Sequence, residues 1–448
     1  MNPSPLPRFS RALLAALPLA LAACASGPLV DQAYYEAPDA RGVQVTQVLL
    51  RGVDEASTPD ELDRVGYNRY ALVDAPSART ILVLVPEWGR GAGWFDGLAR
   101  DLVAEGDALE VWTLNRRQAL LSALAETSAE LDFLRRWDLA LAQRDLAFVC
   151  EAARARGARL ALGGWGLVGG WQAYERAASG ADGAVPLFLL DAWLAPANAG
   201  ERAALGSLRA IARAQLEAGA LTSVGLDPRV RPSTPGDFGF AEQAAFEAER
   251  APEAVSELVE RHPSLASTKR RFTNRGLFAW AFDRPRPRRG DEELASRGPL
   301  ASLQGIAFAE IERRDTEGGP LDDARCGAAC GAPYELEEAL APFSAPGGPF
   351  EAFAPLIGWS DSLEAIETAP ARAARVKRVL AVETATQRGF RERAARVERD
   401  REFQAPTRFA EGVEREVLEL EGDEVAPLLA VEVRRELVEA LLALLEER

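Results

Sequence analysis

Two kinds of hydrophobic pattern alternate along the first half of the chain. Continuous apolar runs such as TILVLVP (80–86) and VPLFLLDAW (185–193) are typical of strands buried on both faces of a parallel sheet. Helical spacing follows the first of them, because Trp94, Leu98 and Leu102 fall on one face of the segment GWFDGLARDLVAEG. The alternation predicts an α/β fold, with a mostly parallel sheet covered by helices.

The same pattern continues to both ends of the chain, with one long interruption. Further strands are expected at 43–50, 67–75, 109–115, 159–165, 375–384 and 413–422, and further helices at 137–157, 170–178 and 427–448. From about Ala195 to about Pro370 the alternation stops, and helical segments with Pro and Gly clusters replace it. This stretch is too long for a loop and predicts an inserted subdomain. The expected organisation is a core over 25–195, a helical lid over 196–370, and the rest of the core over 371–448.

The first 24 residues have the pattern of an export signal. A short basic region precedes the apolar stretch ALLAALPLALAA (12–23), which is too short to span a bilayer. The letters LAAC follow at 21–24, and they resemble the lipobox of bacterial lipoproteins. The resemblance implies a mature chain that begins at Cys24, carries fatty acyl groups such as palmitate, and is tethered to the cell envelope. Ala25 after the cysteine favours the outer membrane. An ordinary cleavage site with an incidental cysteine is the alternative.

Composition narrows the classes of partner and cofactor. The net charge of −16 argues against nucleic-acid binding, which requires a basic face. Cys150 falls on an apolar helical stripe and is expected to be a buried, small hydrophobic residue. Cys326 and Cys330, in CGAAC, are candidates for a local disulfide in an exported protein. A metal site would need four ligands and no histidine stands near this pair, so we expect no metal and no cofactor.

The stretch GGWGLVGGW (163–171) lies where a strand gives way to a helix across a glycine-rich turn. A nucleophile elbow has this layout, with the pattern G-x-S-x-G and a serine at the tip of the turn. Aligned without gaps, Gly166 occupies the serine position, and a shift by one residue places Leu167 there. Neither residue can attack a carbonyl, so the turn has the position of an elbow without its chemistry.

The order of the segments resembles the α/β-hydrolase fold, in which a lid follows the sixth strand. The segment at 80–106 is similar to the third strand, oxyanion loop and first helix of that fold, and LEVWTLNRRQALL (109–121) to the fourth strand and the turn after it. FTNRGLFAWAFD (272–283) resembles a lid segment of hydrolase-like bacterial lipoproteins, and the last helix resembles the end of the fold. The resemblance implies a mostly parallel sheet with a large helical lid inserted after the sixth strand.

The remaining parts of a serine-hydrolase site are altered as well. Such an enzyme needs a base that takes the proton of the nucleophile and an acid that orients the base. The one histidine, His262, lies in the inserted segment, and the resemblance would place the base at Asp423 or Glu424. A carboxylate has a pKa near 4, roughly two units below imidazole, and is a weak base toward a serine hydroxyl. Asp191, at the end of a strand, is the candidate acid, with Glu383 as the alternative.

The oxyanion loop departs from the resembled family at one position. In PEWG, Glu87 stands where that family commonly has Gly or His after the strand. If its ionised carboxylate faced the cleft, it would oppose an oxyanion instead of stabilising it.

These observations favour a lipoprotein that lacks the serine-hydrolase machinery and acts by binding or scaffolding. Its partners would be the membrane, through Cys24, and a ligand or envelope protein that the sequence does not identify. No catalytic residue is assigned, so enzymatic activity is left open but disfavoured. One alternative is an active hydrolase with a rebuilt carboxylate site at Asp191, Asp423 and Glu424. The other is a structural envelope protein whose pocket is filled.

Overall fold

A computed structural model gives the structure of the chain. It describes residues 30–75, 77–121, 131–196, 199–222, 235–261, 271–282, 312–314, 320–322, 336–351, 353–368, 376–384, 414–420, 428 and 431–446. Cys24, His262, Cys326, Cys330, Asp423 and Glu424 lie outside these ranges. None of the helices in the described ranges is long and apolar enough to cross a membrane.

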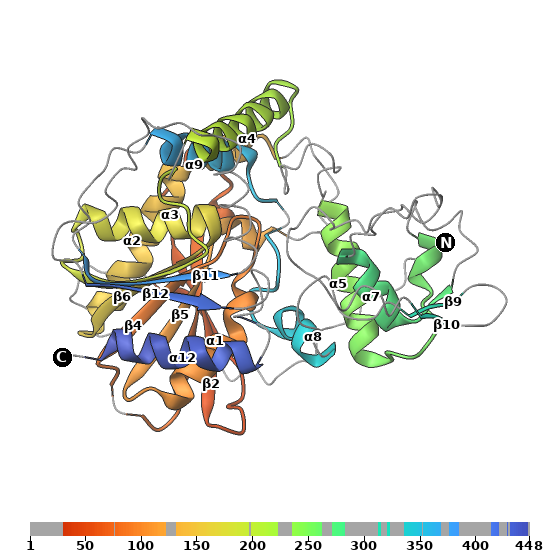
Figure 1. Cartoon of the computed structure of the whole chain (residues 1–448), viewed down its shortest axis with the longest axis horizontal. Helices are drawn as coiled ribbons and strands as arrows, with labels where there is room; N and C mark the ends of the chain where they lie inside the picture. Colours follow the sequence, from red (N-terminus) through yellow and green to blue (C-terminus); the bar gives the residue numbers. More distant parts are fainter. Residues whose placement is uncertain are drawn as a thin grey trace.

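A nine-stranded sheet forms the centre of the described structure (Figure 1). Its order is β1-β2-β3-β5-β4-β6-β7-β11-β12. The strands are β1 (Val30–Tyr35), β2 (Val43–Arg51), β3 (Arg64–Leu72), β4 (Thr80–Val85), β5 (Leu109–Asn115), β6 (Arg159–Trp165), β7 (Val185–Leu190), β11 (Val376–Thr384) and β12 (Glu414–Leu420). The first three strands pair antiparallel and β3 also pairs antiparallel with β5, whereas all pairs from β5 to β12 are parallel. The mostly parallel sheet is therefore confirmed.

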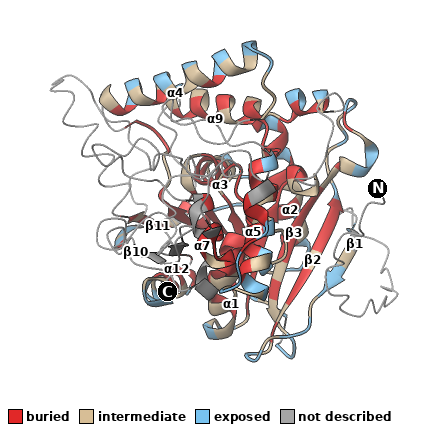
Figure 2. Cartoon of the chain, turned by 90° about the vertical axis from the view of Figure 1, so that its right-hand side faces the viewer, coloured by how far each residue is buried: buried red, intermediate tan, exposed pale blue. Residues whose placement is uncertain are grey.

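Burial along the strands follows the hydrophobic pattern from which they were predicted. Every residue of β4 and β7 is buried, because helices cover both faces of the sheet at these central positions. Figure 2 shows the buried residues gathered on the sheet and on the faces of the helices against it. The strand β1 is not predicted by the sequence; it pairs antiparallel with β2, outside the first expected strand. A short polar and aromatic segment such as VDQAYY carries little apolar periodicity.

Helices cover the two faces of the sheet. On one face lie two helices that contact each other, α1 (Asp96–Glu105) and α12 (Val431–Leu445) (Figure 1). A second group of helices in mutual contact consists of α2 (Leu139–Ala155), α3 (Gly166–Ser179) and α9 (Leu356–Thr368). The predicted stripe of Trp94, Leu98 and Leu102 is fully buried, and Cys150 is a buried free cysteine on α2. The side chain of Asp138 begins α2 by accepting a hydrogen bond from the backbone N–H of Leu141 at 2.7 Å.

The chain leaves the sheet after β7 and returns at β11, which pairs directly with β7. The described helices between them are α4 (Ala199–Glu217), α5 (Pro235–Arg250), α7 (Asn274–Phe282), α8 (Leu336–Ser344) and α9. In Figure 1, α4 packs along α9 above the sheet, whereas α5 and α7 lie to one side with α8 between them and the core. A small sheet was not expected there: β8 (Arg271–Phe272), β9 (Glu312–Arg314) and β10 (Pro320–Asp322) are too short to leave a periodic signal.

Candidate functional site

The glycine-rich turn predicted at 163–171 joins β6 to α3 at the carboxyl end of the central strands. Gly166 is the first residue of α3 and has a φ of +72°. Side chains are disfavoured at such a φ, and a nucleophile elbow is a strained turn of this kind. Gly166 and Leu167 are half-buried. The turn therefore has the backbone of an elbow, and glycine relieves the strain that a serine would have to bear.

The side chain of Glu87 lies over Gly166. Glu87 follows β4, and a Cβ atom added to Gly166 would lie 2.7 Å from its Cδ and closer still to its Oε2. Oε2 accepts a hydrogen bond from the backbone N–H of Val168 at 2.9 Å, in the first turn of α3. The carboxylate thus caps the positive end of the helix from another part of the chain. It faces the elbow, the orientation that the sequence left open, and it occupies the space of a nucleophile side chain.

Burial is the main influence on the charge of Glu87. It raises the pKa of this carboxyl to about 7, although the backbone N–H groups of Trp88 and Val168 and the charges of Arg116 and Arg90 act in the opposite direction. Its second oxygen, Oε1, is buried and has no hydrogen-bond partner within the described ranges. A half-satisfied carboxyl in this environment therefore titrates close to neutral pH.

The loop after β4 is bound along its length by residues that follow α8. The N–H of Gly89 donates to Glu351 Oε2 at 3.2 Å, that of Gly91 to the Pro349 carbonyl at 2.8 Å, and that of Gly93 to the Gly348 carbonyl at 2.9 Å. A Cβ at Gly91 or Gly93 would lie 3.0 or 2.9 Å from the carbonyl carbon of Gly348, so glycine permits this approach. Three N–H groups of the predicted oxyanion loop are consequently engaged within the protein.

A buried ion pair holds Glu351 in place beside the loop after β4. Arg116, after β5, lies 3.1 Å from Glu351 Oε1, and both side chains are almost completely buried. Arg116 also donates to Gln172 Oε1 on α3 at 2.8 Å, and Gln118 donates to Glu351 at 3.2 Å. Burial raises the pKa of Glu351, and the adjacent Arg116 opposes that shift. Glu351 escaped sequence reasoning because nothing local marks a residue whose partner stands 235 positions earlier in the chain.

Aromatic side chains pack around the elbow. The guanidinium of Arg90 lies 4.8 Å from the ring centroid of Trp165 and 5.3 Å from that of Trp94, as in cation–π contacts. The indole of Trp94 donates to the Pro349 carbonyl at 2.6 Å, and that of Trp88 to the Pro355 carbonyl at 3.0 Å. These three tryptophans are buried, so they belong to the packing between the core and the inserted segment.

Asp191, the candidate acid, directly follows β7 and ties it to the neighbouring strand β11. Its Oδ1 accepts from the backbone N–H of Thr384 at 2.8 Å, and its Oδ2 accepts from the hydroxyl of Thr384 at 2.7 Å. Asp191 is buried and has a φ of 49°, which is uncommon for a residue with a side chain. Both oxygens are therefore engaged in joining β7 to β11.

The structure brings together only part of the site predicted from the sequence. It places Gly166 at the elbow and Glu87 over it, and it places Asp191 at the end of β7. Asp423 and Glu424, the expected replacements of the histidine, lie outside the described residues, as does His262. Within the described ranges, no group of three His, Cys, Asp or Glu side chains is arranged to hold a metal ion.

Comparison with known proteins finds similar solved structures at low sequence identity. No family model and no curated protein matches the chain. Among solved structures it is similar to a thermophilic esterase from Thermogutta terrifontis, at 14% identity and a TM-score of 0.38, over 89% of this chain and 98% of the other. It is also similar to epoxide hydrolase A from Mycobacterium thermoresistibile, at 14% identity and a TM-score of 0.37, over 92% and 98%. A monoglyceride lipase from Saccharomyces cerevisiae matches at 11% identity and a TM-score of 0.34, over 94% of each chain.

The fold is α/β-hydrolase-like, and the order and direction of the strands carry this assignment. The third and fourth expected strands, β4 and β5, exchange places in the sheet, and the insertion falls between β7 and β11. A fold of this kind hosts many reactions and also proteins without one, so function has to be argued from the residues around Gly166.

Proposed function

We propose that this chain is an envelope-anchored lipoprotein whose hydrolase-like core acts by binding or scaffolding and not by serine-hydrolase chemistry. The observation that carries the proposal is the Glu87 carboxyl, which lies where a side chain at Gly166 would stand. A nucleophile needs that space to reach a substrate carbonyl. Glycine at the elbow and Glu87 above it are complementary, because a side chain at position 166 would meet the Glu87 carboxyl.

The backbone around the elbow supports the same proposal. An oxyanion hole consists of N–H groups aimed at the place where negative charge develops in the transition state. Here the N–H of Val168 is bonded to Glu87, and those of Gly89, Gly91 and Gly93 are bonded to residues 348–351. Donors that already have internal acceptors are not free to stabilise an oxyanion.

Aromatic packing at the inserted segment favours the related possibility of a structural protein with a filled pocket. Phe350 lies 4.9 Å from Phe238 and 5.6 Å from Phe343, measured between ring centroids, and its backbone pairs with that of Arg90. These rings fill space beside the oxyanion loop. Mass spectrometry of protein purified from its native membrane distinguishes the two roles, because a retained small molecule supports binding and its absence supports the structural role.

Activity assays test the absence of serine-hydrolase chemistry. The chain from residue 25 onwards contains every described residue and is assayed with short- and long-chain nitrophenyl esters and with a fluorophosphonate probe. We expect hydrolysis no faster than with heat-denatured protein and no covalent labelling. Hydrolysis above that background that disappears in Glu87→Gln or Asp191→Asn, with the circular dichroism spectrum unchanged, would overturn the proposal and support a carboxylate-based enzyme.

The membrane anchor is tested separately. The support for it is the lipobox-like LAAC at 21–24. We expect labelled palmitate to be incorporated into the full chain and lost in Cys24→Ser, and fractionation of a Gram-negative host to place the unaltered chain with the outer membrane. An unlabelled, freely released chain would contradict the anchor without affecting the argument about Gly166.

A further inference from the structure

Exposed aromatic and aliphatic side chains gather on the first strand of the sheet. In β1, the side chains of Val30, Tyr34 and Tyr35 are 53%, 47% and 51% exposed. Single exposed hydrophobic residues are common on protein surfaces, but here three of the eight large ones within the described ranges fall on one six-residue strand. This concentration requires an explanation.

The position of β1 in the sheet leaves it accessible. It is the terminal strand of the sheet order and pairs with β2 alone among the described strands. Tyr34 and Tyr35 are consecutive, so they project to opposite faces of the strand and flank its outer edge. The outer edge of β1 is therefore bordered by tyrosine on both sides.

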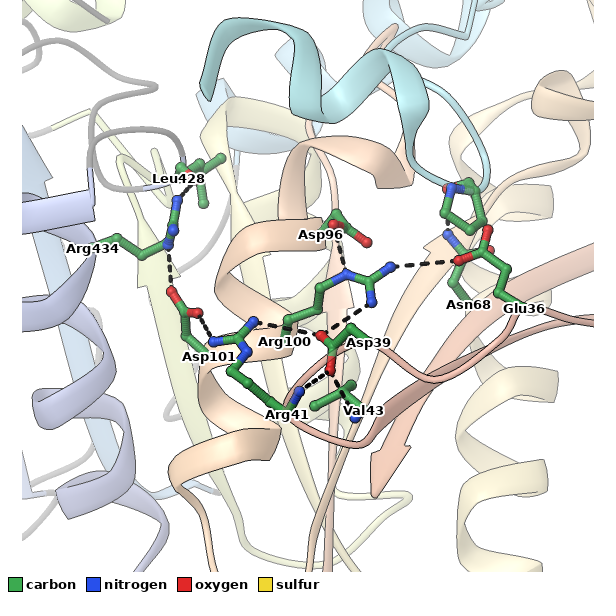
Figure 3. A network of polar contacts seen from close by, with 11 residues as sticks. Glu36, Asp39, Arg41, Val43, Asn68, Asp96, Arg100, Asp101, Leu428 and Arg434 are labelled. Carbon is green, nitrogen blue, oxygen red and sulfur yellow. Dashed lines mark hydrogen bonds and ion pairs between the residues drawn. The ribbon is translucent and has the colours of Figure 1, made fainter. Parts of the chain in front are cut away.

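Polar contacts hold the end of β1 firmly against the core (Figure 3). Glu36, directly after the strand, and Asp39 each lie 3.4 Å from the guanidinium of Arg100 on α1, which also bonds Asp96 at 2.9 Å. Arg41 pairs with Asp101 on the same helix. These contacts fix the direction in which Tyr34 and Tyr35 point relative to the rest of the molecule.

The sequence places β1 close to the proposed site of lipidation. Five residues separate Cys24 from Val30, and even a fully extended chain of that length spans only about 20 Å. Tyrosine is favoured at the boundary between membrane and water, where its ring contacts the lipid and its hydroxyl stays hydrated.

From these observations we infer that the β1 edge, defined by Val30, Tyr34 and Tyr35, docks on the lipid headgroup surface of the membrane that carries the chain. The inference rests on the proposed anchor, which brings the edge within reach of the bilayer. The occupant is a phospholipid surface, recognised by interfacial tyrosine rings and not by charge, since the net charge of −16 disfavours anionic lipid. The docked edge sets which face of the molecule is turned away from the membrane.

Hydrogen exchange on tethered protein tests the docking without requiring lipidation. The chain from residue 25 onwards, with an N-terminal polyhistidine tag, is bound to phosphatidylcholine vesicles that contain a nickel-chelating lipid. We expect slower exchange in the peptide over β1 on tethering, and no change in the peptide over β12. The strand β12 is the matched control, because it is the opposite edge of the same sheet and exposes Val417 to 45%.

Substitutions sharpen the outcome. Tyr34→Ser/Tyr35→Ser should abolish the protection of β1 and reduce the retention of untagged protein on vesicles several-fold, whereas Val417→Ser should change neither. Equal exchange with and without vesicles, or equal protection of both edges, would overturn the docking. Protection of β1 that appears without vesicles and rises with protein concentration would overturn it in favour of pairing between two copies. Loss of palmitate labelling alone would contradict only the anchor.

Discussion

Glu87 and Asp191 are both buried carboxyl groups that follow parallel strands, β4 and β7, on either side of β6, but their surroundings differ. Both oxygens of Asp191 accept hydrogen bonds from Thr384. Glu87 has one oxygen bonded to the N–H of Val168 and one oxygen, Oε1, without a hydrogen-bond partner in the described ranges. A satisfied carboxylate can strengthen a fold, whereas a half-satisfied one in a desolvated place weakens it once ionised.

The contrast indicates which of the two carboxyl groups stabilises the fold. Asp191 connects two strands, a role that serves the fold whether or not a reaction takes place. Burial makes the ionised form of Glu87 unfavourable and raises its pKa to about 7. The main contribution of this carboxyl to stability is the cap that it provides to the first turn of α3. Its fit over Gly166 explains why the elbow tolerates the group, since any side chain there would collide with it.

Filling the elbow should produce the largest effect. In Gly166→Ser the hydroxymethyl group meets Glu87 and the residue has to keep a φ of +72°. Backbone strain of about 1–2 kcal/mol and overpacking of about 1–3 kcal/mol add to a loss of about 2–5 kcal/mol in unfolding free energy. Denaturant unfolding of the chain from residue 25 measures it.

A substitution at a second glycine separates the cost of backbone strain from the cost of the collision with Glu87. Gly183 has a similar φ of +78° with open space around it, so Gly183→Ser should cost only the strain, about 1–2 kcal/mol. Adding Glu87→Ala to Gly166→Ser should recover the part of the unfolding free energy that is lost through the collision. The same addition should not change the loss caused by Gly183→Ser. If Gly166→Ser and Gly183→Ser cost the same, Glu87 does not occupy the elbow in solution.

Much of the sheet could be predicted from the sequence because its central strands are buried on both faces. A run such as that of β4 or β7 has only one stable place in an α/β protein, and the flanking helices carry clear apolar stripes. The strand β1 escaped prediction because it is half-exposed and pairs on one side only, which leaves no strong pattern in VDQAYY.

The candidate site was predictable only where the backbone determined it. Gly166 was found from the strand–turn–helix pattern, since a positive φ at that turn favours glycine. The orientation of Glu87 and its contact with Val168 depend on how the loop after β4 packs on α3, 81 residues later in the chain. The pairing of Arg116 with Glu351 spans 235 residues and has no local signature.

Replacing Glu87 by a neutral residue should remove the pH dependence of stability that its burial imposes. With a pKa of about 7 in the folded chain and 4.5 as its ordinary value, the folded form holds the proton longer. Stability from this group is therefore complete below pH 4.5 and is lost as the pH rises through 7, by about 3 kcal/mol in total. In Glu87→Gln no proton is released, so the variant should be more stable than the unaltered chain at pH 8 by up to that amount.

The difference between the two proteins isolates this group, because all other titrating residues contribute equally to both. Urea unfolding at intervals from pH 4.5 to 8 gives the two stability curves. We expect them to diverge as the pH rises. Parallel curves would mean that Glu87 titrates as in the unfolded chain and that its carboxyl is hydrated in solution, which would break the contrast with Asp191.

The smallest effect is expected at Asp191 itself. Asp191→Asn keeps the shape and can still accept from the N–H of Thr384 and donate to its hydroxyl, so a loss of about 1 kcal/mol in unfolding free energy follows from exchanging charged for neutral hydrogen bonds.

Thr384→Val removes the hydroxyl and leaves Asp191 Oδ2 with one hydrogen bond fewer, at a cost of about 1–3 kcal/mol in unfolding free energy. Because both substitutions change the same bond, between the Thr384 hydroxyl and Asp191 Oδ2, the double variant should lose less than the sum of the single changes. Additive losses would show that Asp191 acts on something other than Thr384, and the assignment of a purely connecting role would then fail.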